Sequence, residues 1–291
     1  FPYTTLFRSW LKGSFATVPR LMQRSDGSLS GSVSEMLESV SDHMESVYNQ
    51  HMEWDTPSQI EYFREKYRES ISQTFCEASV PSLNEQDFWD LCQSKSPTKA
   101  SGLDMWSYRE LQQLPVSAWQ LFVLVCKLVE AVGEWPNIVK CITVTCLPKK
   151  DGPVLNPNQI RAIGVSSVVY SLWSSLRFRH LSTWMNSIAP SCLLGGIPGR
   201  SADSHEIDLS LEFHEHDQNP DPIAIFLDRA KCFDMLVPDF AVQIACDIGL
   251  PLNVARALTG FYRGQIKIFK IGRFYGRKVF SKNSAIQGCS M

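Results

Sequence analysis

The sequence contains no apolar run long enough to cross a membrane, since a membrane-spanning helix needs about 20 predominantly apolar residues. The longest candidate, residues 121–132, is interrupted by Lys127 and Glu130. Nine cysteines stand singly, and no pair has the spacing of a CxxC zinc motif or of a small disulfide framework. These absences predict an intracellular protein with reduced, mostly buried cysteines and with no membrane partner.

Charge of one sign is not in excess either: 28 basic residues stand against 30 acidic ones, and 44% of the 291 residues are hydrophobic. This composition excludes a disordered chain. The charges are segregated, because residues 140–200 and 256–282 are basic while 31–98 and 201–255 are acidic. Basic blocks with aromatic residues are typical of nucleic-acid surfaces, although ordinary solvated faces carry the same charges. The aromatic residues of the second basic block are Phe261, Tyr262, Phe269, Phe274 and Tyr275.

Hydrophobic periodicity predicts several helices. Apolar residues recur every three or four positions over residues 34–48, 58–79 and 168–188. Residues 84–87, with the sequence NEQD, are a typical helix start. Two more helices are expected within residues 240–263, separated at Gly-Leu-Pro.

Strands are expected between these helices. Residues 142–147 and the apolar run 223–227 have strand length and composition. Residues 149–159, rich in Pro, Gly and Asn, are expected to form a loop. Residues 265–281 predict a basic hairpin in which Lys267 and Lys270 lie on the face opposite the isoleucines. The mixture of helices and strands predicts an α+β fold.

Five short blocks with charged residues or glycines follow one another over the last two-thirds of the chain. Residues 226–234, FLDRAKCFD, place a carboxylate directly after the expected strand 223–227. The others are KASGLD at 99–104, LPKK at 147–150 with NP at 156–157 and RAI at 161–163, GIPGRS at 196–201, and QGCS at 287–290.

In this order the blocks resemble those of the reverse transcriptase domain of the non-LTR retrotransposon and group II intron type, an RNA-directed DNA polymerase. The resemblance implies right-hand polymerase fingers at residues 99–200 and a palm at 201–291, truncated before the family's Ala-Asp-Asp motif. A helical linker is expected at residues 10–98. Residues 1–9 match the translation of a sequencing adaptor, so we exclude them from the fold. The implied partners are an RNA template, a DNA primer and deoxynucleoside triphosphates.

The resemblance also implies a two-metal site for Mg²⁺. Asp228 matches the catalytic carboxylate that binds metal, and the backbone carbonyl of Arg229 matches a second ligand. Phe233 matches the bulky ring that lies under the sugar of the incoming nucleotide and favours deoxynucleotides. Without the other motifs, Asp228 would be interpreted as a polar residue at a strand end, and Phe233 as a core residue.

Further residues match nucleotide and nucleic-acid contacts of the family. Lys149, Lys150 and Arg161 match cations that reach the incoming nucleotide, although either lysine is equally compatible with a solvated loop. Gln287 and Gly288 match the segment that packs beneath the templating pair. A separate basic residue, Arg200, matches either a phosphate contact or a structural clamp.

One feature of the sequence limits the expected activity. The sequence contains no tandem Asp pair, so we expect these 291 residues alone not to polymerise. A catalytically dead, polymerase-like RNA-binding remnant is therefore an alternative, and an RNA-dependent RNA polymerase is disfavoured by Phe233.

Met105 also departs from the family, which has Gly at that position. His214 and His216 have a chelating spacing, but their polar surroundings favour a simple loop.

Overall fold

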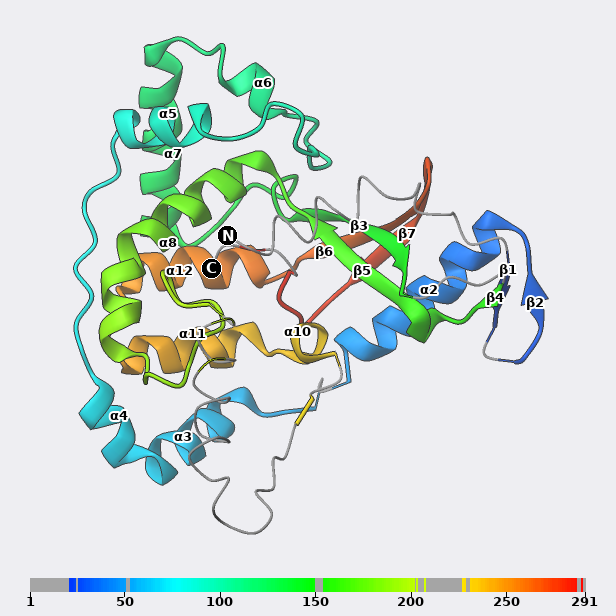
Figure 1. Ribbon diagram of the computed structural model, residues 1–291, viewed down its shortest axis with the longest axis horizontal. Coiled ribbons are helices and arrows are strands. Elements are labelled where there is room, and N and C mark those ends of the chain that lie inside the picture. Colours follow the sequence, from blue (N-terminus) through cyan, green and yellow to red (C-terminus); the bar gives the residue numbers. More distant parts are fainter. Residues whose placement is uncertain are drawn as a thin grey trace.

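The computed structural model describes residues 21–24, 26–50, 53–149, 154–201, 203, 207, 227–228, 231–286 and 289. Within these ranges the chain forms helices and two small sheets, which confirms the α+β prediction. Most helices gather at one end of the molecule, and the larger sheet extends away from them with one long helix beside it (Figure 1). Among the described helices, none is both long enough and apolar enough to span a bilayer.

The larger sheet has four strands in the order β5-β3-β6-β7. Antiparallel pairing joins β3 to β5 and β6 to β7, while β3 and β6 run parallel with Val144 opposite Phe269. The parallel pair β3–β6 lies at the centre of the sheet, and the side chains of Val144 and Phe269 are both buried. The expected strand 142–147 is confirmed by β3 (Cys141–Pro148), and the expected hairpin by β6 (Ile266–Ile271) and β7 (Phe274–Phe280). The fourth strand, β5 (Ile160–Val165), was not predicted.

The smaller sheet corrects the prediction that residues 149–159 are a loop throughout. Strand β4 (Val154–Leu155) pairs in parallel with β1 (Leu21–Gln23), which pairs in turn with β2 (Leu29–Ser30). A 3-10 turn, Pro157–Gln159, follows and is capped by Asn156. Because the partner of β4 lies near the other end of the chain, local composition does not reveal this strand.

Most predicted helices are present. The helices α2 (Val33–Tyr48) and α8 (Val168–Ile188) match their predicted ranges. Asn84 caps α5 (Glu85–Gln93) by accepting a hydrogen bond from Asp87 N at 2.9 Å. The remaining helices beyond residue 100 are α6 (Tyr108–Leu111), α7 (Val116–Val132), α10 (Cys232–Met235), α11 (Pro238–Asp247) and α12 (Leu252–Tyr262), of which α11 and α12 confirm the pair expected within 240–263.

The single helix predicted over residues 58–79 is wrong in its length. The chain instead forms α3 (Thr56–Lys66) and α4 (Arg68–Thr74), which are separated at Tyr67. After α4 the backbone is extended, because Cys76 N and Ala78 N donate hydrogen bonds to the carbonyls of Ile248 and Gly249. These tertiary bonds replace the helical ones that the local pattern favours.

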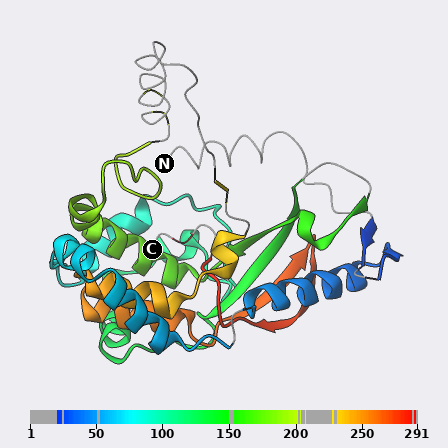
Figure 2. The same ribbon diagram turned by 90° about the horizontal axis from the view of Figure 1, so that it is seen from below.

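One hydrophobic core joins residues from all parts of the described chain, including Met36 of α2, Trp119 of α7 and Phe261 of α12. The approach of α12 to the end of α7 requires a glycine, since a Cβ on Gly260 would lie 1.7 Å from Gly133 O. The linker-like segment before residue 99 is therefore packed against the rest of the molecule. Figure 2 shows α2, in blue, lying along the red strand β7, with which it is in contact.

Met105 stands in a backbone conformation that favours glycine, with a φ of 62°. Its side chain is 76% exposed, so it contributes little packing. We expect Met105→Gly to raise the free energy of unfolding by about 1 kcal/mol, because relief of the left-handed strain exceeds the added freedom of the unfolded chain. Urea denaturation measures this gain. Met105→Ala keeps the strain, so an equal gain in that variant would contradict the explanation.

Candidate nucleotide and nucleic-acid site

Lys149 and Arg161 lie near one end of the β3–β5 strand pair. Arg161 of β5 stands opposite Leu147 of β3, and Lys149 comes directly after Pro148, the last residue of β3. Lys149 N donates to Gln159 O at 2.7 Å, and Lys149 Nζ donates to Asn158 O at 3.0 Å. Both cationic side chains are exposed. The structure thus brings together two of the predicted nucleotide contacts, while Lys150 lies outside the described residues.

The end of β3 is electrostatically coupled to α10 and α2. Burial raises the pKa of Asp234 in α10, and the charges of Lys267, Lys231 and Lys149 oppose that rise. Burial lowers the pKa of Lys231 and of His43, and the charge of Lys149 lowers both further. Lys231 Nζ donates to His43 Nε2, a ring nitrogen of α2, at 2.7 Å.

Helix α10 is bound directly to the segment that follows β7. Ala285 N donates to Phe233 O at 2.8 Å, and Ser284 N donates to Leu236 O at 2.7 Å. These bonds join the FLDRAKCFD block to the residues just before the QGCS block, about fifty positions further along the chain. Gln287 and Gly288 themselves lie outside the described residues.

Phe233 is 54% exposed, which excludes the core interpretation of this ring. It belongs to α10, a single helical turn that begins after Lys231 in the left-handed backbone region, with φ of 53°. An exposed aromatic ring on α10 is available to contact a ligand. This availability is compatible with the predicted role of Phe233 under the sugar of a nucleotide.

The expected buried strand 223–227 is wrong at its described end. Residues 223–226 lie outside the described ranges, but Leu227 is 93% exposed and belongs to no strand. Asp228, which follows it, is exposed as well. An apolar run becomes a buried strand only where a sheet provides a pairing edge, and the described strands pair in the order β5-β3-β6-β7 without it.

The described residues do not fit a magnesium centre. Within them, no group of three or more His, Cys, Asp or Glu side chains is close enough together to hold a metal ion. Among the described residues, Asp228 therefore belongs to no such group. Arg229, whose carbonyl was the other expected ligand, lies outside the described residues, as do His214 and His216.

A buried polar cluster beside α10 is absent from the sequence-based set of candidates. Lys267 Nζ donates to Ser284 Oγ at 2.5 Å and lies 3.8 Å from the centre of the Tyr48 ring. These three residues and Asp234 line a cavity of about 10 Å³, which is the size of one water molecule. Burial lowers the pKa of Lys267 to about 7.

The position of Lys267 corrects the predicted faces of the hairpin. The buried face of β6 contains Lys267 together with Phe269 and Ile271, while Ile266 and Ile268 are half-buried. Alternation alone could have revealed this arrangement, because residues 267, 269 and 271 share one face of a strand. Because lysine is charged, the sequence alone favours the solvent face for Lys267.

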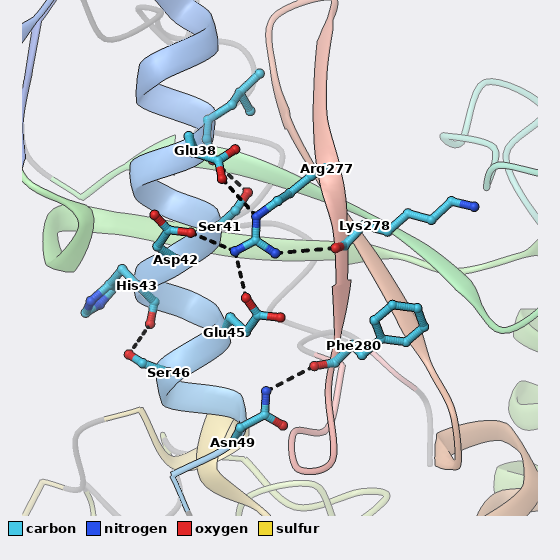
Figure 3. Close-up of polar contacts among 11 residues, drawn as sticks. Glu38, Ser41, Asp42, His43, Glu45, Ser46, Asn49, Arg277, Lys278 and Phe280 are labelled. Atoms are coloured by element: carbon cyan, nitrogen blue, oxygen red, sulfur yellow. Dashed lines mark hydrogen bonds and ion pairs between the residues drawn. The ribbon is translucent and has the colours of Figure 1, made fainter.

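Arg277 does not contribute free charge to the hairpin. Its guanidinium bonds to three carboxylates of α2, Glu38 at 3.0 Å, Asp42 at 2.7 Å and Glu45 at 2.6 Å, as Figure 3 shows. These bonds raise the pKa of Arg277 above its ordinary value. The acidic block of residues 31–98 thus neutralises part of the basic block 256–282.

The aromatic residues of that basic block are divided between core and surface. Phe261, Tyr262 and Phe269 are buried, which contradicts a nucleic-acid role for them. Phe274 and Tyr275, at the tip of the hairpin, are about half exposed. The guanidinium of Arg273 lies over the Phe274 ring, and Lys270 Nζ lies over the Tyr275 ring. Exposed rings paired with cations are suited to stacking on bases.

Arg200 holds the turn after α8. Its guanidinium donates to the carbonyls of Leu193 at 2.8 Å and Ala189 at 3.0 Å, and also to Pro190 O. This geometry favours the structural-clamp interpretation over a phosphate contact. The block 196–201 therefore stabilises the end of α8 in the described part of the chain.

Comparison with known proteins does not assign a family. The scan against protein-family models found no match, and neither did the search of the curated proteins. The function of the chain is therefore inferred from its motifs and from the geometry of the residues that carry them.

Proposed function

We propose that the chain is the fingers and part of the palm of an RNA-directed DNA polymerase of the non-LTR retrotransposon and group II intron type. The observation that supports this most strongly is the bonding of α10 to residues 284–285, which brings the FLDRAKCFD block against the residues just before the QGCS block. Lys149, from a third motif, lies close enough to change the pKa of Asp234. In this proposal, residues 10–98 are a helical linker, 99–200 the fingers and 201–291 the palm.

The roles follow the resemblance. Arg161 and Lys149, with Lys150, contact the incoming deoxynucleotide, and Phe233 lies under its sugar. Gln287 and Gly288 pack beneath the templating pair. Asp228 is the catalytic carboxylate that, with the carbonyl of Arg229, contributes to a Mg²⁺ site completed by other residues. An RNA template and a DNA primer bind beside them, where Phe274 and Tyr275 expose rings.

Nucleotide binding tests the proposal. With a dideoxy-terminated DNA primer on an RNA template, equilibrium dialysis measures the Kd for the complementary deoxynucleoside triphosphate. We expect Arg161→Ala to raise that Kd about tenfold, since a charge-assisted phosphate contact contributes about 1.4 kcal/mol or more. Arg68→Ala, an exposed arginine on α4, is the matched control. Equal Kd values for the two variants would contradict the proposal.

The sugar discrimination has its own test. We expect Phe233→Ala to bring the Kd for a ribonucleoside triphosphate close to that for the matching deoxynucleotide, because the ring no longer opposes a 2′-hydroxyl. Phe280→Ala, which removes a ring of similar exposure from β7, should leave the ratio of the two Kd values unchanged. An unchanged ratio in Phe233→Ala removes the assigned role.

A polymerase-like RNA-binding protein without chemistry is a second candidate. The exposed carboxylate of Asp228 and the absence of a three-ligand metal group among the described residues favour it. Nucleotide binding distinguishes the two candidates, whereas primer extension by the purified 291-residue chain tests the expectation that this chain alone does not polymerise. We expect no extension from it, and a labelled extended primer would contradict that expectation.

A further inference from the structure

Helix α7 has two apolar faces, although only one of them is covered. Its buried residues include Trp119, Val123, Cys126 and Val129. They face the core, where α7 is in contact with α5 and α12. The other face is also apolar and remains exposed over most of the helix, with Leu121 at 62%, Leu124 at 62%, Val125 at 38%, Leu128 at 61% and Val132 at 65%.

These five side chains form one continuous stripe, since their spacings of three, one, three and four residues place them on one side of a helix. We name them the α7 stripe. Lys127, exposed at its flank, is the one charged residue on the outer side of α7 from residue 120 onward. The stripe exposes roughly 500 Å² of apolar surface, near the upper limit for one patch on a monomer. Such a face lowers its free energy by pairing with another apolar surface.

We propose that the α7 stripe joins two copies of this chain in an antiparallel, two-fold symmetric dimer. Four of the five residues of the stripe are symmetric about the midpoint between Leu124 and Val125. A two-fold axis there places each copy's Leu121 against Leu128 of the other, and its Leu124 against Val125 of the other. The apolar surfaces of the two copies are thus matched over residues 121–128, while Val132 lies opposite Ser117.

The area of the stripe is compatible with a second copy as the occupant, and charge favours the antiparallel orientation. Two stripes together bury about 1,000 Å² of surface, which is near the lower limit for a specific interface. The residues that flank the stripes add to this buried area. An antiparallel arrangement displaces the two Lys127 ammonium groups by about 7.5 Å along the axis, whereas a parallel one places them at the same level. Because the interface is small, the dimer is weak, with a Kd in the micromolar range.

Sedimentation velocity over a range of concentrations tests the dimer. We expect a reversible monomer–dimer equilibrium, and a Kd at least about tenfold higher in Leu124→Glu, since two buried charges then face each other. Leu252→Glu, on α12 and 65% exposed, is the matched control and should leave the Kd unchanged. A chain that is monomeric at every concentration would overturn the proposal, and so would a dimer that Leu124→Glu does not weaken.

A charge-swap pair tests the orientation. Leu121→Glu alone and Leu128→Lys alone should each weaken the dimer. The double variant should recover it, because an antiparallel pairing places Glu from one copy beside Lys from the other. A double variant that is weaker than both single variants excludes the antiparallel pairing. These outcomes do not depend on the proposed polymerase function, since no residue of the α7 stripe belongs to the nucleotide site.

Discussion

Glu130→Gln is expected to lower the free energy of unfolding by about 3–5 kcal/mol. Glu130 and Arg177 form a buried ion pair with two bonds of 2.6 Å, and their side chains are only 6% and 2% exposed. Both carboxylate oxygens accept further bonds at 2.8 Å, from Trp173 Nε1 and Asn253 Nδ2. The pair thus links α7, α8 and α12. The amide cannot neutralise the guanidinium, which stays charged and buried.

Urea denaturation followed by circular dichroism measures this effect. Asp239→Asn is the matched control, because Asp239 pairs with Arg263 at 3.2 Å on the surface, where such pairs contribute about 1 kcal/mol or less. The double change Glu130→Leu with Arg177→Met should recover part of the loss, since no unpaired charge remains. A Glu130→Gln loss no larger than that of Asp239→Asn would contradict the role of the buried pair.

The second large effect is the contribution of Lys267 to stability, which rises with pH between about 7 and 10. The pKa of Lys267 is about 7 in the fold, against 10.5 for an ordinary lysine. Between these values the unfolded chain binds more protons than the folded one, so the free energy of unfolding increases with pH, by up to about 1.4 kcal/mol per unit. Below pH 7 both states are protonated and this contribution stays constant.

The other titratable groups that face Lys267 change the free energy of unfolding mainly outside the range from pH 7 to pH 10. The pKa of Tyr48 is raised well above 10 by burial, so its phenol lowers stability only at higher pH, where the unfolded tyrosine ionises. The pKa of Asp234 is raised by burial from 3.8, which affects stability on the acid side. Lys231, whose pKa burial lowers, adds a smaller rise of the same sign.

Lys267→Met isolates the contribution of the buried amine. We expect the variant to have a flatter pH profile and a higher stability at pH 7, by up to about 4 kcal/mol less the cost of leaving Asp234 without this counter-charge. Lys278→Met, exposed on β7, should follow the wild-type profile. Parallel profiles for Lys267→Met and the wild type between pH 7 and 10 would contradict the buried-amine account.

Elements with strong local patterns could be predicted from the sequence. The apolar period of α8 defines both of its ends, and Asn84 marks the start of α5 through its own side chain. The hairpin β6–β7 is likewise local, since its strands are joined by a two-residue turn at Gly272 and Arg273. Such signals depend on neighbouring residues, which is why one sequence is enough to find them.

Features that depend on distant partners could not be predicted. β4 exists because β1 pairs with it, and α4 ends where the carbonyls of Ile248 and Gly249 bind the following backbone. The site shows the same limit. The sequence proposed Lys149, Arg161 and Phe233 as site residues. It did not show that the ring of Tyr48 lies against the Lys267 amine, because Tyr48 comes from α2, far from β6 along the chain.

The proposed function is tested most directly by the lifetime of the complex between this chain and a DNA-primed RNA template with a dideoxy-terminated primer. Fluorescence anisotropy measures the release of the labelled primer in Mg²⁺ buffer. The account predicts that the complementary deoxynucleoside triphosphate slows release at least about fivefold, or ~1 kcal/mol, while mismatched and ribonucleoside triphosphates do not. A release rate that is the same with all of these nucleotides would contradict a polymerase nucleotide site and leave RNA binding as the remaining function.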